Sequence, residues 1–122
     1  MLLDNFFKIL SLEIVGAKAN VRIELDPLHK IYRGHFPEIP VVPGVCMIQM
    51  LDEVMKKIVG REIKMLKGDH IKFLAVIDPM MKKELKFDIN FSINENSKLN
   101  VLAELTNDDI KYFKFKGVYS LM

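Results

Sequence analysis

The sequence is poor in cysteine, in net charge and in long apolar runs, and each of these absences excludes a class of protein. Cys46 is the one cysteine among 122 residues, so neither an intrachain disulfide nor a cysteine metal cluster can form. Lysine and arginine number 18 against 16 aspartates and glutamates, and a formal net charge of +2 is too balanced for a nucleic-acid-binding protein. The most apolar stretch, residues 39–51, contains two prolines and a glutamine and is too short to cross a bilayer.

The first residues also lack the pattern of a secretory signal. No basic residue precedes the first apolar ones, and Asp4 and Lys8 interrupt the run that such a signal needs. A single cysteine suits a reducing compartment. With 50% hydrophobic and 28% charged residues, the chain can bury a core and keep a charged surface. We therefore expect one soluble domain over residues 1–122, located in the cytoplasm, with no membrane and no nucleic acid as partner.

One segment has the length and the period of a substantial helix. Between Val45 and Val59, apolar residues recur three, four or seven positions apart, as they do on the buried side of a helix. Charges begin only at Asp52, so the first two turns have almost no polar face, and a helix that is apolar all round is a buried one. Pro43-Gly44 suits the start of this helix and Gly60 suits its end.

Most of the remaining chain is predicted to form strands. Apolar and polar residues alternate with period two in residues 19–25, 85–93 and 99–105, which is typical of antiparallel strands with one buried face. Further strands are expected at residues 10–15, 71–77 and 110–120. The last run changes phase near Tyr112-Phe113, which indicates a β-bulge. The order is strand, strand, long helix and four strands, so we expect an α+β fold with one antiparallel sheet around one long helix.

The segment between the second strand and the helix, residues 33–45, is the most informative part of the chain. It contains three prolines and two glycines yet is strongly apolar, so we expect it to pack against other groups rather than project into water. His35 lies near its start. Gly44 lies at its end, where a ligand atom can approach the free N–H groups of the helix N-terminus. A titratable base and a group of donors are what forming and stabilising a thioester enolate requires.

This segment resembles the signature of a known enzyme family. Residues 34–37, Gly-His-Phe-Pro, followed by residues 40–45, Pro-Val-Val-Pro-Gly-Val, look like the motif of the β-hydroxyacyl-acyl-carrier-protein dehydratases. Residues 71–73, 78–79 and 113–117 match later strands of that family more loosely. The resemblance implies the hotdog fold, an antiparallel sheet around a long central helix, and a dimer in which two such sheets join.

The resemblance also implies a role for five residues, position by position. His35 matches the catalytic base, and Gly44 matches the glycine whose N–H binds the thioester carbonyl. Val41 matches a residue whose backbone helps to orient the site. Phe36 and Val45 are the other expected substrate-binding residues. No metal and no redox cofactor is implied.

The chain departs from the family at the second catalytic position. The family has a glutamate or aspartate fourteen residues after the histidine, on the central helix, where it reaches the histidine of the opposite protomer; here that residue is Gln49. β-Elimination needs a base for the α-proton and an acid for the leaving hydroxyl. An amide has no proton to give near neutral pH and can only form hydrogen bonds or place a water. Losing a general acid costs roughly 10²–10⁴-fold in rate.

Several of these residues also have simpler interpretations. Gln49 can be a hydrogen-bonded core amide at the dimer contact. Glu53 and Glu38 are weaker candidates for the missing acid, and Glu53 falls where the helix turns polar. Cys46 is more simply a small buried hydrophobe than a reactive thiolate.

The polar surface has a similar choice of interpretations. His29 and His70 have polar neighbours in the sequence and are expected to be solvated. The lysines can form a solvated face or can dock an acidic carrier protein; they are Lys82, Lys83, Lys111, Lys114 and Lys116.

Three functions follow from these observations, in order of preference. The first is a hotdog dehydratase that converts a (3R)-hydroxyacyl thioester on acyl carrier protein to the trans-2-enoyl thioester, in fatty-acid or related lipid or polyene synthesis. The second is a non-catalytic acyl-thioester-binding subunit of a heterodimeric dehydratase. The third is a hotdog thioesterase. The expected assembly is a homodimer or a multiple of it, or a heterodimer with a relative that retains the acid.

Overall fold

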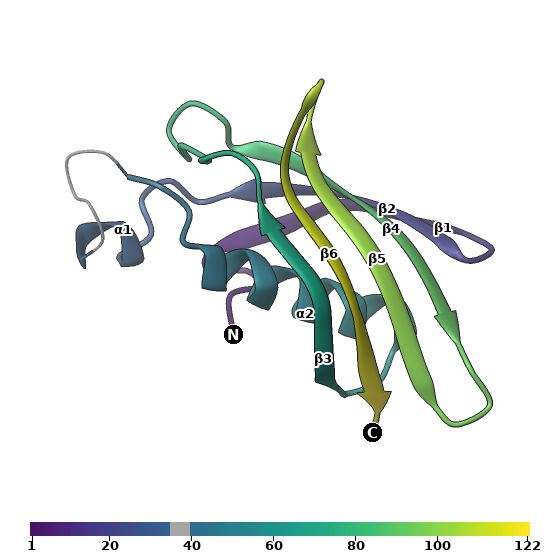
Figure 1. Cartoon of the computed structure of the whole chain (residues 1–122). Coiled ribbons are helices and arrows are strands. Elements are labelled where there is room, and N and C mark those ends of the chain that lie inside the picture. Colours follow the sequence, from purple (N-terminus) through teal and green to yellow (C-terminus); the bar gives the residue numbers. More distant parts are fainter. Residues whose placement is uncertain (35–39) are drawn as a thin grey trace.

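The computed structural model describes residues 1–34 and 40–122, which form a six-stranded sheet and two helices (Figure 1). The strands are β1 (Phe7–Val15), β2 (Lys18–Leu25), β3 (Ile63–Phe73), β4 (Glu84–Ile93), β5 (Lys98–Asn107) and β6 (Ile110–Leu121). The helices are the single turn α1 (Ile31–Gly34) and the long α2 (Gly44–Val59). The strand order is β1-β2-β4-β5-β6-β3, and every neighbouring pair is antiparallel.

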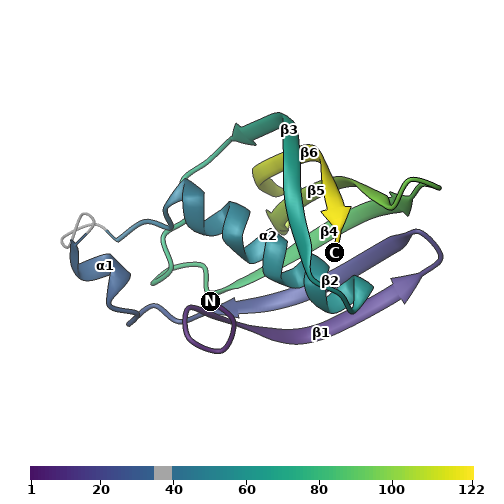
Figure 2. The ribbon, with the colours of Figure 1, turned by 90° about the horizontal axis from the view of Figure 1, so that it is seen from below.

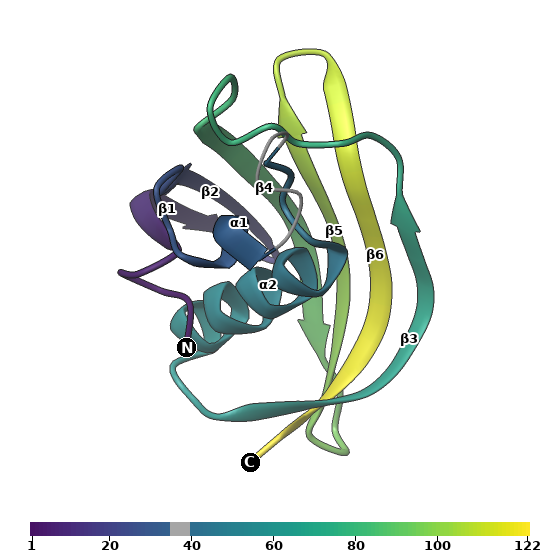
Figure 3. The ribbon, with the colours of Figure 1, turned by 90° about the vertical axis from the view of Figure 1, so that its left-hand side faces the viewer.

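The sheet curves around α2, which lies against its concave face (Figures 2 and 3). The helix side of this contact is fully buried and includes Met50, Leu51, Val54 and Met55. The sheet side consists of the inward-facing residues of the strands, such as Phe87, Leu105 and Phe113. This arrangement confirms the expected α+β hotdog fold, because the strands bury one face only and the helix supplies the apolar surface that covers it.

The two ends of α2 follow from their residues. Pro43, with an extended backbone, precedes the first helical residue, where a missing N–H has no consequence. Gly60 ends the helix in the left-handed conformation at φ 68°, and its N–H donates to the carbonyl of Lys56 at 2.9 Å. The helix therefore starts at Gly44, one residue earlier than the periodicity predicts.

The position of β3 differs from the prediction. A strand was expected at residues 71–77, whereas β3 covers Ile63–Phe73 and the next residues connect it to β4. β3 is an edge strand with Ile63 as its one buried residue, and two register shifts against β6 break its pattern further. Because neither face is consistently buried, the strand carries no period-two signal. The short helix α1 was not predicted either.

The predicted irregularity in the last strand is confirmed. Leu105 pairs with Phe113 while Thr106 pairs with Lys111, so Tyr112 is an extra residue opposite β5. Tyr112 and Phe113 are consequently both buried, although they are neighbours in a strand.

Within the described residues, no helix is long and apolar enough to span a membrane.

Candidate functional site

The N-terminus of α2 carries the hydrogen-bond donors expected of the site. The N–H groups of Cys46 and Met47 donate to the Pro43 carbonyl at 3.0 and 3.3 Å. Within residues 1–34 and 40–122, the N–H groups of Gly44 and Val45 have no hydrogen-bond partner. Free N–H groups at a helix start favour a carbonyl oxygen or an oxyanion, because the helix dipole adds to each hydrogen bond.

The end of β3 lies directly against this helix start. A Cβ atom at Gly44 would be 2.8 Å from Cζ of Phe73, so no larger residue fits there while the Phe73 ring keeps its place. The Phe73 ring itself stacks on Phe113, with 5.5 Å between ring centroids. Phe73 is still 51% exposed, so it forms part of an apolar surface beside the free N–H groups. The sequence singled out Gly44 but did not indicate that Phe73 lies beside it.

The segment that leads into α2 is partly buried and partly exposed. Val42 is buried, and its N–H donates to the carbonyl of Ile77 at 3.0 Å. Val41 is half-buried. Val45 is 71% exposed, which contradicts the expectation that the first turns of the helix are buried all round. Val45 shares this outer side of α2 with Gln49, which lies one turn further on.

Gln49 is hydrogen-bonded within its own helix. Its Nε2 donates to Oε2 of Glu53 at 2.8 Å. Glu53 is only 1% exposed, and its two oxygens also accept hydrogen bonds from the backbone N–H groups of Leu2, at 2.9 Å to each oxygen, and Leu3, at 2.7 Å. The expectation that Glu53 lies on a polar stretch of the helix is therefore wrong, since the N-terminal residues cover it.

A second acidic residue of α2 is tied to the sheet. The hydroxyl of Tyr119 donates to Oδ1 of Asp52 at 2.6 Å, and Tyr119 is fully buried. Burial raises the pKa of Asp52 above its ordinary value, although the Tyr119 hydrogen bond and the charge of Lys56 act in the opposite direction. Burial and the nearby carboxylate raise the pKa of Tyr119 as well, so its hydroxyl stays protonated and remains a donor.

The raised pKa of Asp52 predicts how stability depends on pH. A carboxyl group with a raised pKa in the folded state contributes stability at low pH and loses it as the pH rises through that pKa. Asp52→Asn keeps an acceptor for Tyr119 and removes the ionisation. We expect its free energy of unfolding to improve relative to the wild type as the pH rises from about 4 towards neutrality. Urea denaturation of both proteins at a series of pH values measures this; a constant difference would contradict it.

The surroundings of the one cysteine and of the two described histidines fit structural or surface residues. Cys46 is buried, and burial raises the pKa of its thiol, as expected for a small hydrophobe. His70 is exposed on β3. His29 is half-buried rather than solvated: its ring lies edge-on to Phe6 with 5.3 Å between centroids, and its Nδ1 accepts from the N–H of Ile31 at 3.1 Å.

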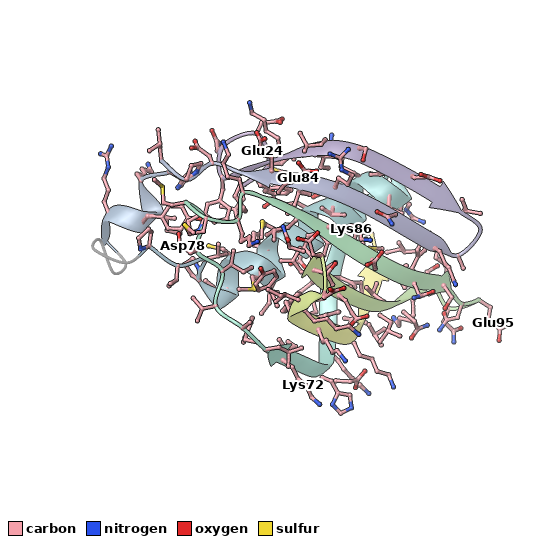
Figure 4. The ribbon with its side chains drawn as sticks, turned by 90° about the horizontal axis from the view of Figure 1, so that it is seen from above. Glu24, Lys72, Asp78, Glu84, Lys86 and Glu95 are labelled. Carbon is pink, nitrogen blue, oxygen red and sulfur yellow. The ribbon has the colours of Figure 1, made fainter. Side chains whose placement is uncertain are left out.

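The outer face of the sheet, seen in Figure 4, carries charges of both signs. Glu84 and Lys86 lie on β4, and Lys72 lies near the end of β3. Two of the lysines considered as a docking surface share one carboxylate: Lys111 and Lys114 lie 3.1 and 3.8 Å from Oε2 of Glu104.

Three residues named from the sequence, His35, Phe36 and Glu38, lie outside the described residues. Their expected roles remain predictions. In the part of the chain that the structure describes, no group of three or more histidine, cysteine, aspartate or glutamate side chains has the arrangement of a metal site.

Comparison with solved structures shows the same fold in several proteins. The dehydratase heterocomplex ApeI:P from Xenorhabdus doucetiae is 22% identical, with 92% of this chain and 96% of that chain covered and a TM-score of 0.72. The conserved protein PA5202 from Pseudomonas aeruginosa is 17% identical, with 97% and 90% covered and a TM-score of 0.68. A hypothetical thioesterase with coenzyme A from Streptococcus pneumoniae TIGR4 is 11% identical, with 95% and 85% covered and a TM-score of 0.69.

Sequence comparison identifies the family. No curated protein sequence matches the chain. The profile of the ApeI-like family, described as ApeI dehydratase, matches residues 13–116. This match covers the helix start with Gly44, the outer side of α2 with Gln49 and all of β2 to β5. The chain therefore belongs to the ApeI-like dehydratase family and has its hotdog fold.

Proposed function

We propose that this protein eliminates water from a (3R)-hydroxyacyl thioester and releases the trans-2-enoyl thioester. The observation that carries the proposal is the start of α2, where the N–H groups of Gly44 and Val45 have no partner among the described residues. His35, nine positions before Gly44 in the sequence, is the proposed base. Membership of a dehydratase family supports the same reaction.

The proposed reaction assigns a task to each residue. His35 removes the α-proton, and the electrons move towards the thioester carbonyl, whose oxygen accepts a hydrogen bond from Gly44 N–H. The carbon–oxygen bond at the β-position then breaks, and the hydroxyl leaves as water with a proton that a solvent water or the acid of an acid-bearing partner chain supplies. The amide of Gln49 cannot give that proton. Val41, Phe36 and Val45 line the proposed acyl site, and no metal or cofactor takes part in the proposal.

We propose that the complete site needs two chains. Val45 and Gln49 lie on the outer side of α2, which the rest of the single chain leaves partly uncovered. The unpaired edges of β1 and β3 also favour pairing with a second chain. The partner is a second copy or a relative that retains the acid, and ApeI:P is itself a dehydratase heterocomplex. An acyl carrier protein in the cytoplasm is the proposed source of the substrate.

A non-catalytic acyl-binding subunit is the second candidate, and Gln49 at the acid position favours it. Such a subunit would keep the free N–H groups and the apolar surface around Phe73 while its partner supplies the chemistry. Thioester hydrolysis is a candidate because a hypothetical thioesterase shares the fold. It ranks third because the chain has the Gly-His-Phe-Pro motif that resembles that of the dehydratases.

Purification of the chain alone tests both the assembly and the reaction. Sedimentation at micromolar concentration is expected to give at least twice the chain mass of 14.1 kDa. The same sample is expected to convert a hydroxyacyl thioester to the enoyl thioester slowly, because both sites of a homodimer lack the acid. A monomer would exclude a second copy as the partner. Release of free thiol without enoyl product would show hydrolysis instead.

A further inference from the structure

The hydrogen bond between Gln49 and Glu53 fixes which end of the Gln49 amide faces outward. Nε2 and Oε1 of an amide differ in chemistry, because the nitrogen donates and the oxygen accepts. Glu53 receives three backbone or side-chain N–H donors, from Leu2, Leu3 and Gln49, at 2.7 to 2.9 Å. Since carboxylate oxygens accept hydrogen bonds, the nitrogen of Gln49 must be the end that faces Glu53.

The oxygen of the same amide therefore points away from Glu53. Within residues 1–34 and 40–122, no donor binds Oε1 of Gln49. Gln49 is half-buried on the outer side of α2, three positions from the half-buried Asp52. This oxygen is therefore free to accept a hydrogen bond from an occupant of this side of the helix that brings a donor.

Glu53 can hold this orientation because it is itself held from the opposite side. Its carboxylate is 1% exposed, and the backbone N–H groups of Leu2 and Leu3 fix both oxygens. Figure 3 shows the N-terminal end of the chain beside α2. Because this carboxylate is held in place and only accepts hydrogen bonds, the amide of Gln49 keeps Nε2 towards it.

We infer that Glu53 is a positioning residue that turns Oε1 of Gln49 towards the substrate, where it accepts a hydrogen bond from the 3-hydroxyl group. This inference rests on the proposed function and makes Gln49 a specificity-determining residue rather than a residual acid. A hydroxyacyl chain supplies the O–H donor that Oε1 needs. The corresponding saturated acyl chain leaves the oxygen unpaired and binds more weakly.

The amide orientation can be tested without any activity, because Gln49 is the one glutamine in the chain. Its side-chain NH₂ gives a single pair of glutamine signals in a ¹⁵N-edited NMR spectrum. We expect two well-separated proton signals, one of them protected from solvent exchange by Glu53. Glu53→Ala is expected to shift this pair, whereas Glu62→Ala, the same change at a 75% exposed side chain, leaves it in place. Signals of a freely exchanging amide in the wild type would overturn the inference even if Glu53→Ala fails to fold.

Ligand discrimination tests the role of that orientation. The probes are unreactive pantetheine amides of a (3R)-hydroxyacyl chain and of the matching saturated chain, bound to the full-length protein. The wild type is expected to prefer the hydroxyl by about tenfold or more, and Glu53→Gln to lose most of this preference. Equal affinity of the wild type for both probes would overturn the inference. A wild type that shows the preference but yields no enoyl product would contradict the proposed reaction and leave the role of Glu53 intact.

Discussion

Gln49→Glu is expected to raise the rate of dehydration by at least an order of magnitude. A positioned general acid contributes roughly 10²–10⁴-fold, and the resemblance to the dehydratases implies an acid at this position. Glutamate nearly matches glutamine in size, so the helix should pack unchanged. The introduced carboxyl group would lie beside Glu53, at the place where Nε2 now lies 2.8 Å from Oε2. Two adjacent carboxyl groups resist double ionisation, so the pKa of the introduced group rises and it keeps its proton at higher pH.

The measurement is enoyl-thioester formation by wild type and variant in parallel, over a range of pH. The gain should fade as the pH rises through the raised pKa of the introduced group, and the stability of the variant should fall over the same range. Gln49→Ala removes the amide without adding an acid and is the matched control, for which no gain is expected. Strong wild-type turnover with no gain in Gln49→Glu would show that a water or Glu38 supplies the proton. Two inactive proteins that still bind acyl thioesters would favour the non-catalytic subunit.

His35→Ala is expected to abolish the thioester chemistry and to leave the fold intact. Imidazole is the side chain whose ordinary pKa, about 6.5, suits removal of a proton near neutral pH. Loss of a general base lowers rates by roughly 10²–10⁴-fold. His70→Ala is the matched control, because His70 is exposed on β3 and no role in the site is proposed for it.

Initial rates and thermal unfolding of both histidine variants distinguish a catalytic from a structural role. An active His35→Ala protein would refute the proposed base. A variant that unfolds would instead favour a structural histidine. An unchanged melting temperature with lost turnover is the expected result.

The elements that were predicted most closely are those in which one face is buried. Alternate residues of β2, of β5 and of the first part of β4 are buried, so burial imposes a period of two on these sequences, and α2 shows its own period for the same reason. β3 has little contact with the core, and its location could not be read from apolar residues. The apolar run after it, which includes the 70% exposed Val76, is a connection rather than a strand.

The candidate site divides in a similar way. Gly44 and Gln49 lie in or near a short motif and were singled out because this motif resembles that of the dehydratases. Glu53 and Asp52 depend on contacts with Leu2 and Tyr119, which lie 51 and 67 positions away in the sequence. Their charges suggested a polar end of the helix, and only the three-dimensional structure brings the N-terminal residues and β6 against them. The one sequence signal was the place of Glu53 among the apolar residues of the helix, where a glutamate is buried only if other groups donate hydrogen bonds to it.

The bulge at Tyr112 makes one-codon deletions in β6 unequal in effect. Removing Tyr112 would bring Lys111 and Phe113 together opposite Thr106 and Leu105, which are already neighbours, so regular pairing would take the place of the bulge. A deletion of one codon after Phe115 has no such irregularity to absorb it. Every later side chain would then exchange faces, and Tyr119 would leave the core and its hydrogen bond to Asp52. We therefore expect β6 to tolerate the deletion of a residue near its start, at the bulge, and not further along the strand.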